Sequence, residues 1–214
     1  MTTQPYSQVY RQFADIELTD YQRVIRTYEE LEREIGRLDI DEYFELTVRY
    51  VDALFHSGAY RRHLLMVDAV IETTIENNIL NYKGRDIFSH MLFCKAASAF
   101  RVQDYEQARH VTQELIKIYP ERKLFRRMLR AIAFKEQQSL LQFGRAAFIF
   151  CLLAAALVIV VDLLLVDPFY PDEHYAMVWL RNDLFIISGV LLAGCFGYAW
   201  WKANWEASNF GRTK

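Results

Sequence analysis

The chain has 214 residues, of which 53% are hydrophobic and 24% are charged, with a formal net charge of −2. This length allows one folded domain together with a membrane segment. The three cysteines stand singly in the sequence, which excludes a disulfide framework and a CxxC redox or metal motif. The charge is unevenly spread, because residues 1–120 carry net −5, residues 121–145 net +5 and residues 146–214 net −2.

The first 120 residues predict a helical domain, because glycine and proline separate segments of helical length. The opening MTTQPYSQVYRQF has neither the basic segment nor the apolar core of a signal peptide, so we expect a cytosolic domain. Apolar residues at 3/4 spacing and capping residues define the helices. We expect helices from Tyr21 to about Gly36, from Asp41 to about Phe55, from Tyr60 to about Ile79, from Asp86 to Phe100 and from Tyr105 to Tyr119.

An internal comparison aligns residues 52–60 with residues 97–105 at an offset of 45. Each segment places a phenylalanine five residues before a tyrosine, at the turn between two predicted antiparallel helices. One interpretation is an aromatic plug that any helical hairpin needs near its turn. The other is a helical repeat, in which each hairpin buries its faces against its neighbours.

Residues 89–122 resemble a tetratricopeptide repeat. The similarity lies in Ala96, Ala99, Phe100, Asp104-Tyr105-Glu106-Gln107-Ala108, Leu115 and Pro120. Residues 43–78 depart from this pattern, because His63 stands where the family has a small alanine and the offset is 45 instead of 34. The resemblance implies a right-handed stack of helical hairpins whose concave face binds a peptide or protein, and it implies no chemistry. By analogy, the groove would be lined by Asp52, His56, His90, Phe93, Arg101, Arg127 and Lys135.

Two apolar runs predict a transmembrane hairpin. Residues 146–166 contain one ionisable side chain, Asp162, and are long enough to cross the ~30 Å core of a bilayer. Residues 184–201 form the second run, which leaves a loop at 167–183 and a tail at 202–214. We expect the soluble domain to cover residues 1–145, with its last helix, from about residue 121, continuous with the first span. A break at Gln142-Phe143-Gly144 is the alternative.

The charges around these runs predict their orientation. The net +5 before the first span, −3 in the loop and +2 after the second span place both termini in the cytoplasm, in a bacterial-type inner membrane. Asp162 either pairs with Arg181 near the outer interface or contacts another membrane subunit. Gly189, Ala193 and Gly197 recur every four residues, a spacing that suits packing against the first span or against a partner span.

Motifs for catalysis or cofactor binding are missing from the sequence. GxGxxG, GxxxxGK[ST], GxSxG and HExxH do not occur, so we predict neither an enzyme nor a bound cofactor. His90 and Cys94 lie four residues apart, but two ligands do not make a zinc site, so we predict a core histidine and a buried cysteine. The basic segment beside a membrane helix is explained by topology and contact with anionic lipid, without nucleic acid.

The sequence therefore predicts an all-α protein, a tetratricopeptide-like hairpin stack followed by two transmembrane helices. We expect a membrane-anchored scaffold that binds a protein or peptide partner at the cytoplasmic face. The alternative is an accessory subunit of a larger membrane complex, in which the hairpin makes the specific contacts, with a homo-oligomer or another membrane subunit as its partner.

Overall fold

The computed structural model describes residues 7–17, 19–79, 81–82, 84–166 and 174–209. Within these residues the fold is all-α apart from one short pair of strands, and two helices are long and apolar enough to cross a membrane. The chain divides into two compact units, residues 1–125 and residues 126–214, which we call the helical unit and the hairpin unit. The division falls earlier than the predicted domain end at residue 145.

The predicted helices of the helical unit are confirmed, with ends that shift by at most three residues. A short helix that was not delimited from the sequence, α1 (Gln8–Ala14), comes first. It is followed by α2 (Tyr21–Ile35), α3 (Ile40–His56), α4 (Tyr60–Glu76), α5 (Ile87–Arg101) and α6 (Tyr105–Ile118). Between α4 and α5 lie the strands β1 (Asn81–Tyr82) and β2 (Arg85–Asp86), which pair antiparallel.

Aspartate residues fix where several helices begin. Asp20, Asp86 and Asp104 each precede a helix, and each carboxylate accepts a hydrogen bond from the backbone N–H three residues later, at 3.0–3.1 Å. This contact satisfies one of the amides that have no partner within the first helical turn. The N-cap at Asp86 therefore sets the start of α5, the helix that carries His90 and Cys94.

The two aligned segments form the same turn. Phe55 and Tyr60 meet edge to face with ring centroids 5.9 Å apart, and Phe100 and Tyr105 do so at 5.7 Å. In each turn the backbone N–H after the turn bonds a carbonyl five residues earlier at 2.9 Å, Ala59 to Leu54 and Asp104 to Ala99. Gly58 and Gln103, again 45 residues apart, both have positive φ, 80° and 68°. The end of α4 has the same backbone bond, from Ile79 to Thr74 at 2.9 Å, and a positive φ at Asn78, so the Phe–Tyr contact is the feature that the two aligned turns share beyond a common helix end. No tetratricopeptide repeat follows from this.

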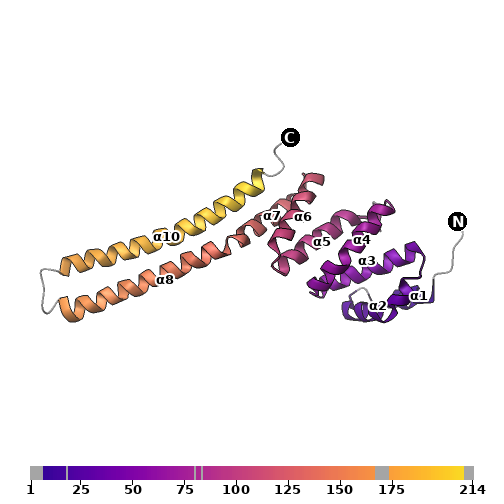
Figure 1. Cartoon of the computed structure of the whole chain (residues 1–214), viewed down its shortest axis with the longest axis horizontal. Helices are drawn as coiled ribbons and strands as arrows, with labels where there is room; N and C mark the ends of the chain where they lie inside the picture. The colour runs from indigo at the N-terminus through magenta and orange to yellow at the C-terminus, as the bar shows by residue number, and fades with distance from the viewer. Residues whose placement is uncertain (1–6, 18, 80, 83, 167–173, 210–214) are drawn as a thin grey trace. The chain divides into compact units, whose positions relative to one another are not determined.

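Each helix from α2 to α5 packs against the next one in the chain (Figure 1). The core of the helical unit lies between them and is almost inaccessible to solvent. Its members Phe13, Val51, Leu54, Val67 and Met91 are all less than 1% exposed. This successive packing brings α3, α4 and α5 together, which positions the site described below.

The long helix predicted from residue 121 is interrupted. Helix α7 (Lys123–Glu136) ends before Gln137, and α8 (Gln138–Val161) begins after it and continues as the π-helical turn η1 (Asp162–Val166). The prediction of one continuous helix is therefore wrong, and the break is also not at residues 142–144. No glycine or proline marks Gln137, so residue composition gave no signal there.

Helix α10 (His174–Asn209) is much longer than its apolar run. Its 36 residues extend about 54 Å, so residues 174–183 of the predicted loop and 202–209 of the predicted tail are helical. The rest of that loop, 167–173, and of that tail, 210–214, lies outside the described residues. Hydropathy detects the apolar part of a helix and not its ends, which explains the difference.

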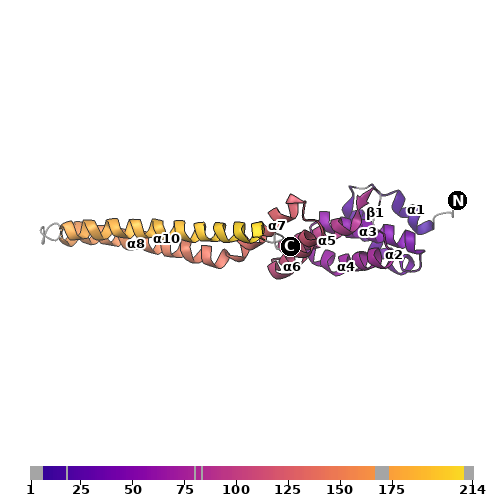
Figure 2. The same cartoon turned by 90° about the horizontal axis from the view of Figure 1, so that it is seen from above.

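Helices α8 and α10 lie side by side, as both views show (Figure 1, Figure 2). A Cβ added to buried Gly144 would lie 2.9 Å from both Cβ and Sγ of Cys195, so glycine permits this close approach. Gly189, Ala193 and Gly197 do not serve this contact. All three are exposed, and among the described residues no atom lies within 4 Å of a Cβ added at either glycine. Packing against the first span is therefore not their role here.

Candidate functional site

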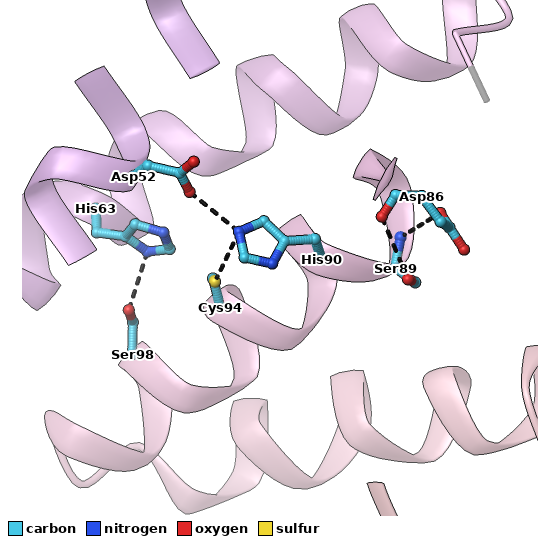
Figure 3. A network of polar contacts seen from close by, with 7 residues as sticks. All are labelled: Asp52, His63, Asp86, Ser89, His90, Cys94 and Ser98. Carbon is cyan, nitrogen blue, oxygen red and sulfur yellow. Dashed lines mark hydrogen bonds and ion pairs between the residues drawn. The ribbon is translucent and has the colours of Figure 1, made fainter. Parts of the chain in front are cut away.

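Three polar side chains converge within the helical unit. Asp52 comes from α3, and His90 and Cys94 lie one helical turn apart on α5. Nε2 of His90 lies 3.1 Å from Oδ1 of Asp52 and 3.8 Å from Sγ of Cys94 (Figure 3). One potential ligand atom from each residue lies within 4.8 Å of the other two. The two predicted groove residues Asp52 and His90 are thus brought together, with Cys94 as their third member.

The charge state of this cluster follows from its contacts. The hydrogen bond to Asp52 and the contact with Cys94 raise the pKa of His90 to about 10, although burial opposes them. Without a further ligand, Nε2 therefore holds a proton at neutral pH and forms an ion pair with the Asp52 carboxylate. The side chains of Asp52 and His90 are each 35% exposed, whereas Cys94 is buried. The cluster is open to solvent on its Asp52–His90 side.

A second histidine lies beside the cluster. His63, on α4, is completely buried, and its Nδ1 lies 2.9 Å from Oγ of Ser98. Burial lowers the pKa of His63 to about 4, so its ring is neutral at pH 7. Its Nε2 is buried and has no hydrogen-bond partner among the described residues. In Figure 3 the ring lies on the same side as Asp52, with its free edge facing the gap toward His90 and Cys94.

The geometry restricts the chemistry of the cluster. In a nucleophilic triad the carboxylate binds one ring nitrogen of the histidine and the nucleophile binds the other. Here Asp52 and Cys94 both approach Nε2 of His90, so the histidine does not relay a proton between them. Three potential ligand atoms around one point instead match the arrangement in which side chains coordinate a metal ion.

The other predicted groove residues of the helical unit have different surroundings. His56 is exposed and stacks on Tyr21 with ring centroids 5.1 Å apart. Phe93 is half-buried and packs against Phe125 at 6.0 Å. Arg101 is exposed at the end of α5. Of these three, His56 and Arg101 are the exposed side chains.

The remaining predicted residues belong to the hairpin unit. Arg127 is exposed on α7, and Lys135 lines a small pocket of about 140 Å³ with Arg145 at the junction of α7 and α8. The guanidinium of Arg145 also lies 5.5 Å from the ring centre of Phe196 on α10. Asp162 and Arg181 are half-buried, in η1 and α10 respectively, and their pairing stays a prediction.

Sequence reasoning missed how these polar groups assemble. The i, i+4 spacing of His90 and Cys94 was visible, but Asp52 lies 38 residues from His90 and reaches it only through the fold, in which α3 packs on α4 and α4 packs on α5. One signal for the site was present in the sequence. His63 stands at a position where the aligned segment, 45 residues later, has the small residue Ala108. Comparison with protein-family models, with curated proteins and with solved structures finds no match to this chain.

Proposed function

We propose that this protein is a membrane-anchored scaffold, with a tetratricopeptide-like helical unit that binds a protein or peptide partner. The observation that carries the proposal is the repeated turn, because two hairpins with the same turn geometry, packed in succession, are how helical-repeat proteins build a binding surface. Binding of a partner requires no catalytic group, and the sequence contains no catalytic motif.

The membrane part of the proposal rests on α8 and α10. Their candidate spans cover Gln138–Leu164 and Tyr175–Ser208, and only 6% and 11% of their most apolar windows are buried. Helices this apolar and this exposed are suited to a lipid environment. With the charge distribution of the sequence, we propose two spans, an external loop and both termini in the cytoplasm of a bacterial-type inner membrane.

A charge reversal tests the partner-binding surface. Arg101→Glu changes an exposed cation on α5, and Arg61→Glu is the matched control, an exposed cation on α4. The full chain and both variants are solubilised in detergent and used to capture partners, which are identified by mass spectrometry. We expect a specific soluble partner that Arg101→Glu loses and Arg61→Glu retains. Equal capture by all three proteins would place the binding surface elsewhere.

One observation favours the alternative, an accessory subunit of a larger membrane complex. Gly189, Ala193 and Gly197 form an exposed small-residue face on α10 that α8 leaves free. Small residues at this spacing permit close approach of a further transmembrane helix. In this second candidate function the hairpin unit, and not the helical unit, selects the partner.

A further inference from the structure

The cluster on α3 and α5 has the dimensions of a metal site. In tetrahedral zinc sites the bonds to nitrogen, oxygen and sulfur are about 2.0–2.3 Å, which places neighbouring ligand atoms roughly 3.3–3.6 Å apart. The separations from Nε2 of His90, 3.1 Å to Asp52 and 3.8 Å to Cys94, lie on either side of this range. The third separation, between the ligand atoms of Asp52 and Cys94, is at most 4.8 Å, so side-chain rotations that bring these two atoms into the same range would place all three around one cation.

The ligand types select the class of metal. A thiolate, an imidazole and one carboxylate suit a borderline-soft divalent ion such as Zn²⁺, whereas Mg²⁺ and Ca²⁺ are bound by sets of oxygen ligands. Cys94 supplies the soft donor from a buried position, and the partly exposed Asp52 and His90 leave a path from solvent. A cation held there would replace the proton on His90.

The surroundings of the cluster give a second, independent indication. His63 is a fully buried histidine with an unpartnered Nε2, which is costly in a simple packing role. When Nδ1 donates its proton to Ser98, Nε2 carries a free lone pair on the side facing the cluster (Figure 3). Hydrogen bonding of the other ring nitrogen is the usual way in which proteins orient a metal-binding histidine.

The second hairpin has no polar residues at the positions equivalent to Asp52 and His63. The residues 45 positions after Asp52 and His63 are Ala97 and Ala108, so the second hairpin makes the equivalent turn with alanine at both places. The turn of the second hairpin therefore forms without either polar residue.

We propose that Asp52, His90 and Cys94 bind a Zn²⁺-class divalent cation that links α3 to α5, with His63 beside it. The site goes beyond scaffold function, because it does not depend on any partner. The full chain, freed of affinity tag and treated with chelator, is dialysed against Zn²⁺ or Co²⁺ in detergent. Metal content, the cobalt absorption spectrum and the thermal unfolding of the protein are then measured.

We expect one equivalent of metal per chain, a thiolate-to-cobalt charge-transfer band and a higher unfolding temperature with Zn²⁺. Cys94→Ser should remove the band and weaken Zn²⁺ binding at least tenfold, while Cys151→Ser and Cys195→Ser, at the two other free cysteines, leave both unchanged. Asp52→Asn, which keeps the size of the side chain, should also weaken binding, and circular dichroism verifies that each variant is folded.

Two results would overturn the proposal. The first is a folded wild-type chain that retains no Zn²⁺ after dialysis, which would leave the cluster as an Asp52–His90 ion pair. The second is metal binding that Cys94→Ser does not change, which would place the metal at another site.

Discussion

Replacing Gly144 tests the packing of α8 against α10. In Gly144→Ala the new Cβ would lie 2.9 Å from both Cβ and Sγ of Cys195. Non-bonded carbon atoms pack best at about 3.5–4.0 Å, so the two helices or the side chain must move by several tenths of an ångström. Overpacking of this kind costs about 1–3 kcal/mol of the free energy of unfolding.

The matched control is Gly194→Ala on α10, where, in the part of the chain that the structure describes, an added Cβ meets no atom within 4 Å. Both substitutions replace a glycine inside a helix and share the gain in helix propensity of about 1 kcal/mol. The difference between the two variants, about 1–3 kcal/mol, therefore isolates the contact with Cys195.

The free energy is measured by SDS-induced unfolding of the detergent-solubilised chain, followed by tryptophan fluorescence. Adding Cys195→Gly to Gly144→Ala removes both clashing atoms and should recover most of the loss, a coupling that a double-mutant cycle quantifies. Equal shifts for Gly144→Ala and Gly194→Ala, or the absence of coupling, would show that Gly144 and Cys195 are not in close contact.

Three further outcomes are expected. Because Gly58 and Gln103 both have positive φ, Gly58→Ala should destabilise the helical unit by about 1 kcal/mol and Gln103→Gly should stabilise it by a similar amount. The free energies are measured by chemical unfolding, and two changes of the same sign would contradict the shared turn. Lowering the pH of metal-free protein from 6.5 to about 4 should cost on the order of 3 kcal/mol of unfolding free energy. The loss occurs on acidification because burial lowers the pKa of His63 in the folded chain, so the unfolded chain takes up the proton first. His63→Ala should reduce this pH dependence. An unchanged dependence of the unfolding free energy on pH would exclude His63 as its source. In a cysteine-free chain, a cysteine at Ser208 should react with an impermeant maleimide only after the membrane is opened, and one at Tyr175 in intact cells; the reverse pattern would reject the proposed topology.

The helices of the helical unit were predictable because their signals are local. Capping aspartates and glycine turns fix helix ends within a few residues, and the Phe–Tyr spacing was enough to locate two equivalent turns. The polar cluster was only half predictable, since the sequence shows the His90–Cys94 spacing but not which residue of α3 faces it. That pairing depends on how two helices are rotated against each other, which local pattern does not determine.

The same limit applies to the hairpin unit. Two sets of small residues recur every four positions on α10, and helix packing was predicted at the first set, Gly189, Ala193 and Gly197. The structure instead buries Ala199, Ala203 and Ala207 and leaves the first set exposed. The approach to α8 uses Gly144 opposite Cys195, a pair that becomes visible only when the register of the two helices is known.

In the proposed function the helical unit selects the partner and the hairpin anchors the protein in the membrane. The most direct test replaces residues 146–209 with an unrelated two-span hairpin and compares captured partners of this chimaera with those of the full chain by mass spectrometry. The scaffold account predicts that both chains recover the same soluble protein. Loss of that protein from the chimaera, with integral membrane proteins recovered only by the full chain, would contradict it and support the subunit alternative.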